Sequence, residues 1–225
     1  MAMKITRDEI ISIILIGVGL GLLLEKGEEY MSGDMLIKWF LKKYKNAFKR
    51  VANKFGYDPL ILMAHALHES RRRRNDISGL AKKYNNFFGI KCHKNYKSCI
   101  YLITHEYRFS KEYPDTSYFR NAKLIGKTKN GQYEFVGEAP FKRYDSVEQG
   151  LEDYIKLIKK YYPEAYRNRT NPEQYFEGLF HGKKYSNGKY RKYSTTRKSV
   201  YVKSCMKLYN KLFSEYNREV TNEVS

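Results

Sequence analysis

The stretch of residues 60–70 ends in side chains that could do acid–base or metal chemistry. It reads LILMAHALHES and carries His65, His68 and Glu69 at the end of an apolar run. A carboxyl group beside apolar residues can have a raised pKa, keep its proton near neutral pH and act as a general acid. A lone glutamate at a helix end is, however, far more often a solvated surface residue. The order His-x-x-His-Glu matches neither HExxH nor HxxEH, so metal binding is not expected.

The elements that must position Glu69 are expected to be helices. Asp58-Pro59 is an N-cap followed by proline at the first helical position, and it predicts a helix that carries His65, His68 and Glu69. Before it, apolar residues recur at helical spacing from Leu36 to Phe55 and predict an amphipathic packing helix.

Further along the chain the pattern changes to strands and then returns to helices. Residues 100–136 are strand-like, and Asn130-Gly131 predicts a tight hairpin turn. Ser146 and Gln149 form a capping box before an apolar helical face, and residues 200–216 predict a final helix. The fold class predicted from this order is α+β, mainly α, with a small β lobe in the middle.

Several motifs follow Glu69 in a fixed order. They are SGLAKKYNNFFGIKC at 78–92, THEY at 104–107 and FKRYDSVEQGLEDYIKLI at 141–158. Together they resemble glycoside hydrolase family 73, the bacterial and phage glucosaminidases related to the flagellar peptidoglycan hydrolase domain. The resemblance covers residues 57–212 and implies a lysozyme-like helical domain with a β-hairpin lobe. Several ordered motifs are more specific than any one of them.

The resemblance also implies the site residues. Glu69 takes the place of the general acid, and Glu106 in THEY takes that of the proposed second carboxylate on the β lobe. Tyr193 in YST resembles the tyrosine of the family's YAT motif near the cleaved bond. Asn85 and Asn86 match the Asn pair before FGIK, where their amides would bind an N-acetyl group or orient Glu69. The alternative for this pair is a cap on the turn.

The chain departs from the family pattern in three places. Residues 71–74, four arginines, replace the usual glycine-tryptophan-glycine, and Thr196-Arg197 replaces the expected Asp-Pro. The stretch from Glu106 to Phe141 is longer than usual and predicts an extended hairpin. Three other carboxylates therefore stay open as alternatives to Glu106, namely Glu112, Glu134 and Glu138. The aromatic and aliphatic residues of the motifs are expected in the core rather than at the substrate, namely Phe87, Phe88, Ile90, Phe141 and Tyr144.

The net charge, the N-terminal sequence and the cysteines indicate a class of partner and a cellular compartment. The net charge of +19 favours any dense polyanion, including nucleic acid, anionic lipid and anionic cell wall. The uncharged run at 10–24 is shorter than a comfortable spanning helix, and we interpret it first as an uncleaved anchor, second as an export signal and third as a buried helix. Cys92 and Cys99 could bridge a local loop in an oxidising compartment.

These observations predict a peptidoglycan hydrolase that cuts glycan strands at the N-acetylglucosaminyl bond and needs no metal or organic cofactor. We expect an anchor or signal-like segment at 1–33, a catalytic domain at 34–217 and a tail at 218–225. The enzyme would act at the bacterial envelope, exported or membrane-anchored, and if of phage origin it would be virion-associated or in the host periplasm. Muramidase-type cleavage by the same fold and a basic nucleic-acid-binding protein are the alternatives. No nucleic-acid motif supports the second alternative, so no specific nucleic acid is expected as a partner.

Overall fold

The structure, a computed structural model, describes residues 32–72, 76–92, 98–114, 118–129, 131–185, 188, 190–194 and 196–224. The apolar run at 10–24 lies outside the described residues, so its three interpretations stay predictions. In the described part of the chain, no helix is long and apolar enough to cross a membrane.

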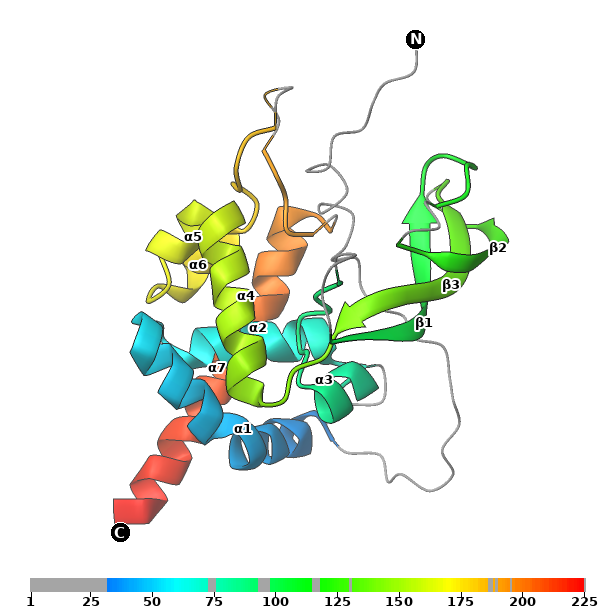
Figure 1. The fold of residues 1–225 in the computed structure, drawn as a ribbon. Helices are drawn as coiled ribbons and strands as arrows, with labels where there is room; N and C mark the ends of the chain where they lie inside the picture. Colours follow the sequence, from blue (N-terminus) through cyan, green and yellow to red (C-terminus); the bar gives the residue numbers. More distant parts are fainter. Residues whose placement is uncertain are drawn as a thin grey trace.

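Helices dominate the described chain, and a group of strands interrupts them (Figure 1). The helices are α1 (Gly33–Phe55), α2 (Pro59–Ser70), α3 (Gly79–Tyr84), α4 (Val147–Tyr161), α5 (Pro163–Arg167), α6 (Pro172–Gly178) and α7 (Lys198–Val224). The strands are β1 (Cys99–Arg108), β2 (Arg120–Lys127) and β3 (Tyr133–Lys142). This order confirms the predicted α+β class with a central β lobe.

The predicted helix starts are confirmed by their caps. The Asp58 side chain accepts a hydrogen bond from the Leu60 backbone N–H at 2.8 Å, with Pro59 in the first turn of α2. At α4, the Ser146 hydroxyl accepts from the Gln149 N–H at 3.2 Å, and the Gln149 side chain reaches back to the Asp145 N–H at 2.9 Å. Such caps satisfy backbone donors that have no partner within the helix, which fixes where each helix begins.

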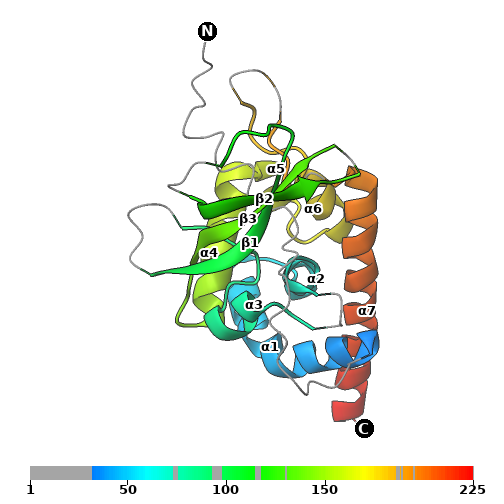
Figure 2. The ribbon, with the colours of Figure 1, turned by 90° about the vertical axis from the view of Figure 1, so that its right-hand side faces the viewer.

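Helix α2 is the centre of the helical body. Every residue from Leu60 to Leu67 is buried, so the helix is enclosed on all sides. Figure 2 looks nearly along α2 and shows α1, α4 and α7 arranged around it. Because α2 carries Glu69 in its last turn, the densest part of the core fixes the candidate acid in place.

Helix α7 runs antiparallel to α2 and contacts it from end to end. Tyr209 of α7 donates to Asp58 at the start of α2 at 2.8 Å, and Tyr201 donates to Glu69 at its end. The helix is longer than the predicted 200–216. It continues past the predicted domain boundary at 217 to Val224, so residues 218–224 belong to the last helix.

The strands form an antiparallel sheet in the order β1-β3-β2, which extends from the helical body (Figure 1). Its inner face packs a second hydrophobic cluster that includes Leu80 of α3, Phe119, Phe135 and Phe141. Strands β2 and β3 are the extended hairpin that the sequence predicted. Gly131 in their connection has φ 81°, a left-handed conformation that glycine adopts without strain, while Asn130 lies outside the described residues.

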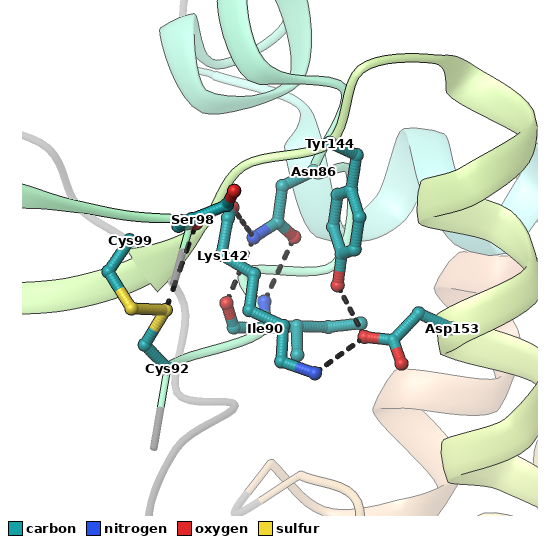
Figure 3. Close-up of a disulfide and its surroundings, with 8 residues drawn as sticks. All are labelled: Asn86, Ile90, Cys92, Ser98, Cys99, Lys142, Tyr144 and Asp153. Atoms are coloured by element: carbon teal, nitrogen blue, oxygen red, sulfur yellow. Dashed lines mark hydrogen bonds and ion pairs between the residues drawn. A yellow bond between two sulfur atoms is a disulfide. The ribbon is translucent and has the colours of Figure 1, made fainter. Parts of the chain in front are cut away.

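A polar junction joins the sheet to α4 (Figure 3). The Asp153 carboxylate accepts hydrogen bonds from Lys142 of β3 at 2.8 Å and from the Tyr144 hydroxyl at 2.6 Å. One helical turn earlier, Gly150 packs against the α3 end so closely that an added Cβ would lie 2.2 Å from the Asn85 carbonyl oxygen. The motif at 141–158 therefore clamps the β lobe onto the helices.

A disulfide joins Cys92 to Cys99, with their Cα atoms 6.0 Å apart (Figure 3). It links the segment after α3 to the first residue of β1, which confirms that these two cysteines bridge a local loop. Cys205, on α7, is free and buried.

Candidate functional site

Glu69 lies at the C-terminal end of α2 with most of its side chain enclosed. Its side chain is 12% exposed, whereas the neighbouring residues Leu67 and Ser70 are buried at 0% and 2%. The carboxyl group is therefore not in bulk solvent, as a surface helix end would be, although part of the side chain remains exposed.

Two side chains hold the Glu69 carboxylate. The Tyr201 hydroxyl, on α7, donates to Glu69 Oε1 at 2.5 Å. His65, one turn earlier on α2, has its Nε2 atom 3.6 Å from the same oxygen and 2.7 Å from the Tyr201 hydroxyl. The spacing of His65 and Glu69 at i and i+4 places them on one helix face, whereas no local signal connects either residue with Tyr201.

The ionisation of Glu69 differs from the sequence prediction. Burial is the largest single influence and raises the pKa of Glu69. Hydrogen bonding and charge from His65, with smaller contributions from His68 and Tyr201, lower the pKa, and together they outweigh the effect of burial. The net pKa lies below the ordinary carboxyl value. The prediction that apolar surroundings alone would raise this pKa is therefore wrong for the free protein, because buried donors face the carboxylate.

The hydrogen bonds continue from His65 into the core. His65 is 0% exposed, and its Nδ1 atom lies 2.5 Å from the Tyr154 hydroxyl of α4. The Tyr154 hydroxyl lies 2.8 Å from that of Tyr175 in α6. Four helices thus contribute to one buried polar chain that ends on Glu69. Sequence reasoning considered His65 only as a metal ligand and missed its two hydrogen-bond partners, Tyr154 and Tyr201.

Tyr193 packs beside this chain. Its ring centroid lies 4.8 Å from that of His65, and its hydroxyl is buried without a hydrogen-bond partner among the described residues. Burial and the nearby charge of Glu69 raise the pKa of Tyr193 well above its usual value, so the phenol keeps its proton. Tyr193 thus lies beside the residues that surround Glu69.

His68 points to a different group. Its Nδ1 atom lies 3.2 Å from the Ser204 hydroxyl of α7, and burial lowers its pKa despite the charge of Glu69. His65 and His68 therefore have separate hydrogen-bond partners.

Glu106 is the carboxylate on the inner face of the sheet. It pairs across the sheet with Phe135, a member of the second hydrophobic cluster, and its side chain is 12% exposed. Arg108 Nε lies 3.3 Å from its carboxylate. Nearby, burial lowers the pKa of the Lys91 amine, while the charge of Glu106 acts in the opposite direction.

The three alternatives to Glu106 lie elsewhere. Glu134 and Glu138 pair with Tyr107 and Ile103, which point to the other sheet face because successive strand residues alternate. Glu134 is held there by His105 at 2.7 Å and by the Tyr107 hydroxyl at 2.9 Å. Glu112 is exposed and lies outside the strands. Of the four carboxylates, Glu106 alone combines the inner face with low exposure.

The asparagine pair is engaged in supporting the backbone. Asn86 is 1% exposed, and its side-chain amide donates to the carbonyls of Ile90 and Lys142 while its oxygen accepts from the Ile90 N–H. Asn85 ends α3 with φ 55° and donates to the Tyr144 carbonyl at 2.9 Å. Both amide protons and the oxygen of Asn86 are used within the protein, so its geometry favours the turn-capping alternative over N-acetyl binding.

The motif residues expected in the core are there. The exposed fractions of these residues lie between 1% and 8% for Phe87, Phe88, Ile90, Phe141 and Tyr144.

In the arginine loop that replaces the glycine-tryptophan-glycine, Arg71 forms an isolated β-bridge with Ile77, and residues 73–75 lie outside the described part.

Comparison with known proteins gives a family match and two informative structural similarities. The glucosaminidase family model, described as mannosyl-glycoprotein endo-beta-N-acetylglucosaminidase, matches residues 45–221. The catalytic domain of the autolysin Auto from Listeria monocytogenes superposes with a TM-score of 0.52 at 20% identity, covering 87% of this chain and 89% of that one. The glycoside hydrolase domain of Salmonella typhimurium FlgJ gives 0.50 at 18% identity, covering 86% and 96%. Among curated proteins, none matches by sequence.

Proposed function

This chain belongs to the glucosaminidase family of glycoside hydrolases, and we propose that it cuts peptidoglycan glycan strands at the N-acetylglucosaminyl bond with Glu69 as general acid. The observation that carries the proposal is the position of Glu69, enclosed at the end of the central helix, bonded to Tyr201 and exposed over a small part of its side chain. The match over most of the chain disfavours the nucleic-acid-binding alternative.

The reaction needs a proton for the leaving glycosidic oxygen and negative charge near the oxocarbenium-like centre. In the free protein the donors around Glu69 hold its pKa low. A glycan strand bound over the exposed part of this side chain removes the remaining water from it, and desolvation raises a carboxyl pKa. Substrate binding therefore favours the protonated, donating form of Glu69.

Glu106 supplies the second carboxylate in this proposal. Its inner-face position and its low exposure suit a group that faces the sugar from the β lobe. The Arg108 guanidinium orients this carboxylate, which in the proposal stabilises a cationic transition state or orients the attacking water. Tyr193, whose buried ring packs on His65, supports the residue that neighbours Glu69 in this proposal.

The test compares four purified variants in a peptidoglycan gel. Glu69→Gln is expected to abolish clearing with an unchanged circular dichroism spectrum, because the amide has no proton to donate. Glu106→Gln should lower clearing strongly, whereas Glu138→Gln and Glu134→Gln, on the outer face, should clear as the parent does. Clearing by Glu69→Gln would contradict the acid assignment. Mass spectrometry of the released muropeptides identifies the reducing sugar, and N-acetylmuramic acid there would replace the glucosaminidase assignment with a muramidase one.

The surface charge and the apolar run at 10–24 locate the enzyme at the envelope in this proposal. A net charge of +19 concentrates the protein on anionic walls and leaflets, and the apolar run anchors it in the membrane. The uncleaved chain should therefore sediment with membranes, and Ile14→Glu should release it. Recovery of a shortened chain from the medium would favour the export-signal interpretation instead.

A further inference from the structure

A lysine amine shares the inner face of the sheet with the candidate second carboxylate. Lys91 forms an isolated antiparallel bridge with Phe141 of β3, and directly opposite residues of an antiparallel pair point their side chains to the same face. Phe141 belongs to the second hydrophobic cluster, and so does Phe135, which pairs with Glu106. Lys91 and Glu106 therefore project from the same face of the β lobe. Lys91 has no part in the acid–base roles proposed above.

The backbone around Lys91 is held in place on both sides. The Cys92 N–H donates to the Pro140 carbonyl at 2.9 Å. The Lys142 N–H donates to the Ile90 carbonyl, also at 2.9 Å. The disulfide of Cys92 ties the next residue to the start of β1 (Figure 3). The fold thus fixes the backbone from which the amine projects, which lowers the entropy that a ligand contact costs.

The amine of Lys91 has no acidic partner in the described part of the chain. No carboxylate oxygen there lies within 4.0 Å of it, and no hydrogen bond holds it. Glu106, whose charge acts on Lys91, is bonded instead to Arg108 at 3.3 Å. The side chain of Lys91 is half-buried, and burial lowers the pKa of its amine because the charged form loses water. Such a cation gains more from an anion than a fully hydrated surface lysine does.

Lys91 also adds an uncompensated positive charge to the inner face. Along β1 and β3, the charged side chains on this face are Glu106 and Arg108. These two offset each other across 3.3 Å, whereas Lys91 remains. A glycan strand that binds against Glu106 would therefore meet a free ammonium group on the same wall of the site.

Peptidoglycan differs from a neutral aminosugar polymer in its carboxylates. Each N-acetylmuramic acid carries a lactyl group, whose carboxyl is either free or joined to a peptide stem that has carboxylates of its own. We propose that Lys91 is a specificity-determining residue that binds a carboxylate borne by the muramic acid sugar, on its lactyl group or on its stem. The amine and this carboxylate form a charge-assisted hydrogen bond, which favours peptidoglycan over neutral glycans. This inference rests on the proposed peptidoglycan hydrolase function.

The test removes the charge from each partner in turn. Lys91→Met keeps an unbranched side chain without the amine, and carbodiimide coupling with methylamine converts the carboxylates of soluble peptidoglycan fragments to neutral amides. For the parent, amidation should lower kcat/KM about tenfold or more, mainly through KM, because the charge-assisted bond is lost. Lys91→Met should already show this loss on untreated fragments and lose little more on amidation. An equal loss on amidation in the parent and in Lys91→Met would overturn the proposal.

Two further variants are the controls. Lys123→Met removes the same unit charge from an exposed position on β2 that pairs with Val136 on the outer face, and it should keep the parent values on both substrates. Lys91→Arg restores a cation and should recover most of the preference for untreated fragments. If Lys123→Met lost as much as Lys91→Met, general attraction by the net charge of +19 would replace the proposed site. A kcat that fell equally on both substrates in Lys91→Met would also overturn the proposal, because the amine would then act only through Glu106.

Two additional measurements identify the carboxylate and separate this proposal from the catalytic one. Amidase treatment removes the stems and frees the lactyl carboxylate, so dependence on Lys91 that persists assigns the lactyl group, and dependence that disappears assigns the stem. Calorimetry in the Glu69→Gln background, with and without Lys91→Met, measures the same preference as dissociation constants without turnover. Failure of the proposed function would leave the fragments uncut by the parent. Failure of the Lys91 proposal would leave the parent active and its affinity for the fragments unchanged by amidation.

Discussion

The hydroxyl of Tyr201 joins the candidate acid to the rest of the protein, so Tyr201→Phe is an informative change. It deletes one oxygen that donates to Glu69 Oε1 at 2.5 Å and lies 2.7 Å from His65 Nε2. The phenylalanine ring keeps the edge-to-face packing on His68, whose ring centroid is 4.6 Å away. The effect should therefore report the hydrogen bonds rather than a lost side chain.

The expected cost is that of one hydrogen bond to a carboxylate. Such bonds contribute about 1.5–3 kcal/mol to stability. A second penalty for His65 is avoided, because its Nε2 atom lies 3.6 Å from Glu69 Oε1 and a shift of about 0.7 Å makes an ordinary hydrogen bond. For a chain of this size, roughly 2–4 °C of melting temperature is lost per kcal/mol, so Tyr201→Phe should melt about 3–12 °C lower at pH 7.

The difference in melting temperature between the parent and Tyr201→Phe should depend on pH. The folded-state pKa of Glu69 is lowered, so its ionised form stabilises the protein above the ordinary carboxyl pKa of 4.5, and this stability is lost as pH falls through the folded value. Tyr201 is one cause of the lowering. The melting difference between parent and Tyr201→Phe should thus be largest above pH 4.5 and shrink below it.

The pH dependence of activity tests the same Tyr201–Glu69 hydrogen bond. Without the Tyr201 bond the pKa of Glu69 rises, so the alkaline limb of kcat/KM should move to higher pH. The control is Tyr209→Phe on the same helix, which removes a 2.8 Å bond to Asp58 far from Glu69. It should lower the melting temperature without moving the pH profile. A melting difference that stayed constant from pH 7 to pH 3.5, or an alkaline limb that did not move, would refute the reasoning.

Three further changes follow from the structure. Asn86→Ala should destabilise the fold by about 3 kcal/mol, because it removes the hydrogen bonds to Ile90 and Lys142 and leaves the buried Ile90 N–H without its acceptor, and denaturant melts should show this without a change in KM. Gly150→Ala should be destabilising by at least about 2 kcal/mol or prevent folding, since the new Cβ would lie 2.2 Å from the Asn85 carbonyl oxygen; a soluble variant with the parent's melting temperature would contradict the packing. Binding to purified walls should weaken steeply as salt rises from 50 to 500 mM because exposed charges are screened, and salt-independent sedimentation would argue against charge as the cause.

Local signals in the sequence determined the starts of the helices and the place of the β lobe. Asp58-Pro59 and Ser146 with Gln149 predict their helices because a cap bonds to backbone groups two or three residues away, and no distant contact is needed. Gly131 marks the hairpin for the same reason. The end of the last helix was predicted too early, since the pairing of Lys45 with Glu219 extends α7 along α1.

The candidate acid could also be found from the sequence, because apolar residues around Glu69 and the ordered motifs after it are readable without coordinates. Whether Asn86 contacts a sugar or the backbone could not be decided in this way. Its partner Lys142 is 56 positions away, and a side chain satisfied by distant carbonyls looks the same in sequence as a free one.

Only the tertiary structure decided which carboxylate of the β lobe faces inward and in which direction the pKa of Glu69 moves. Strand alternation separates Glu106 from Glu134 and Glu138, but the register across β1 and β3 decides which face is covered. The pKa of Glu69 depends on Tyr201, 132 positions later, and on His65, whose own partner Tyr154 is 89 positions away. Electrostatic effects act over a few ångströms of space, and the sequence alone does not reveal which distant residues the fold brings within that range.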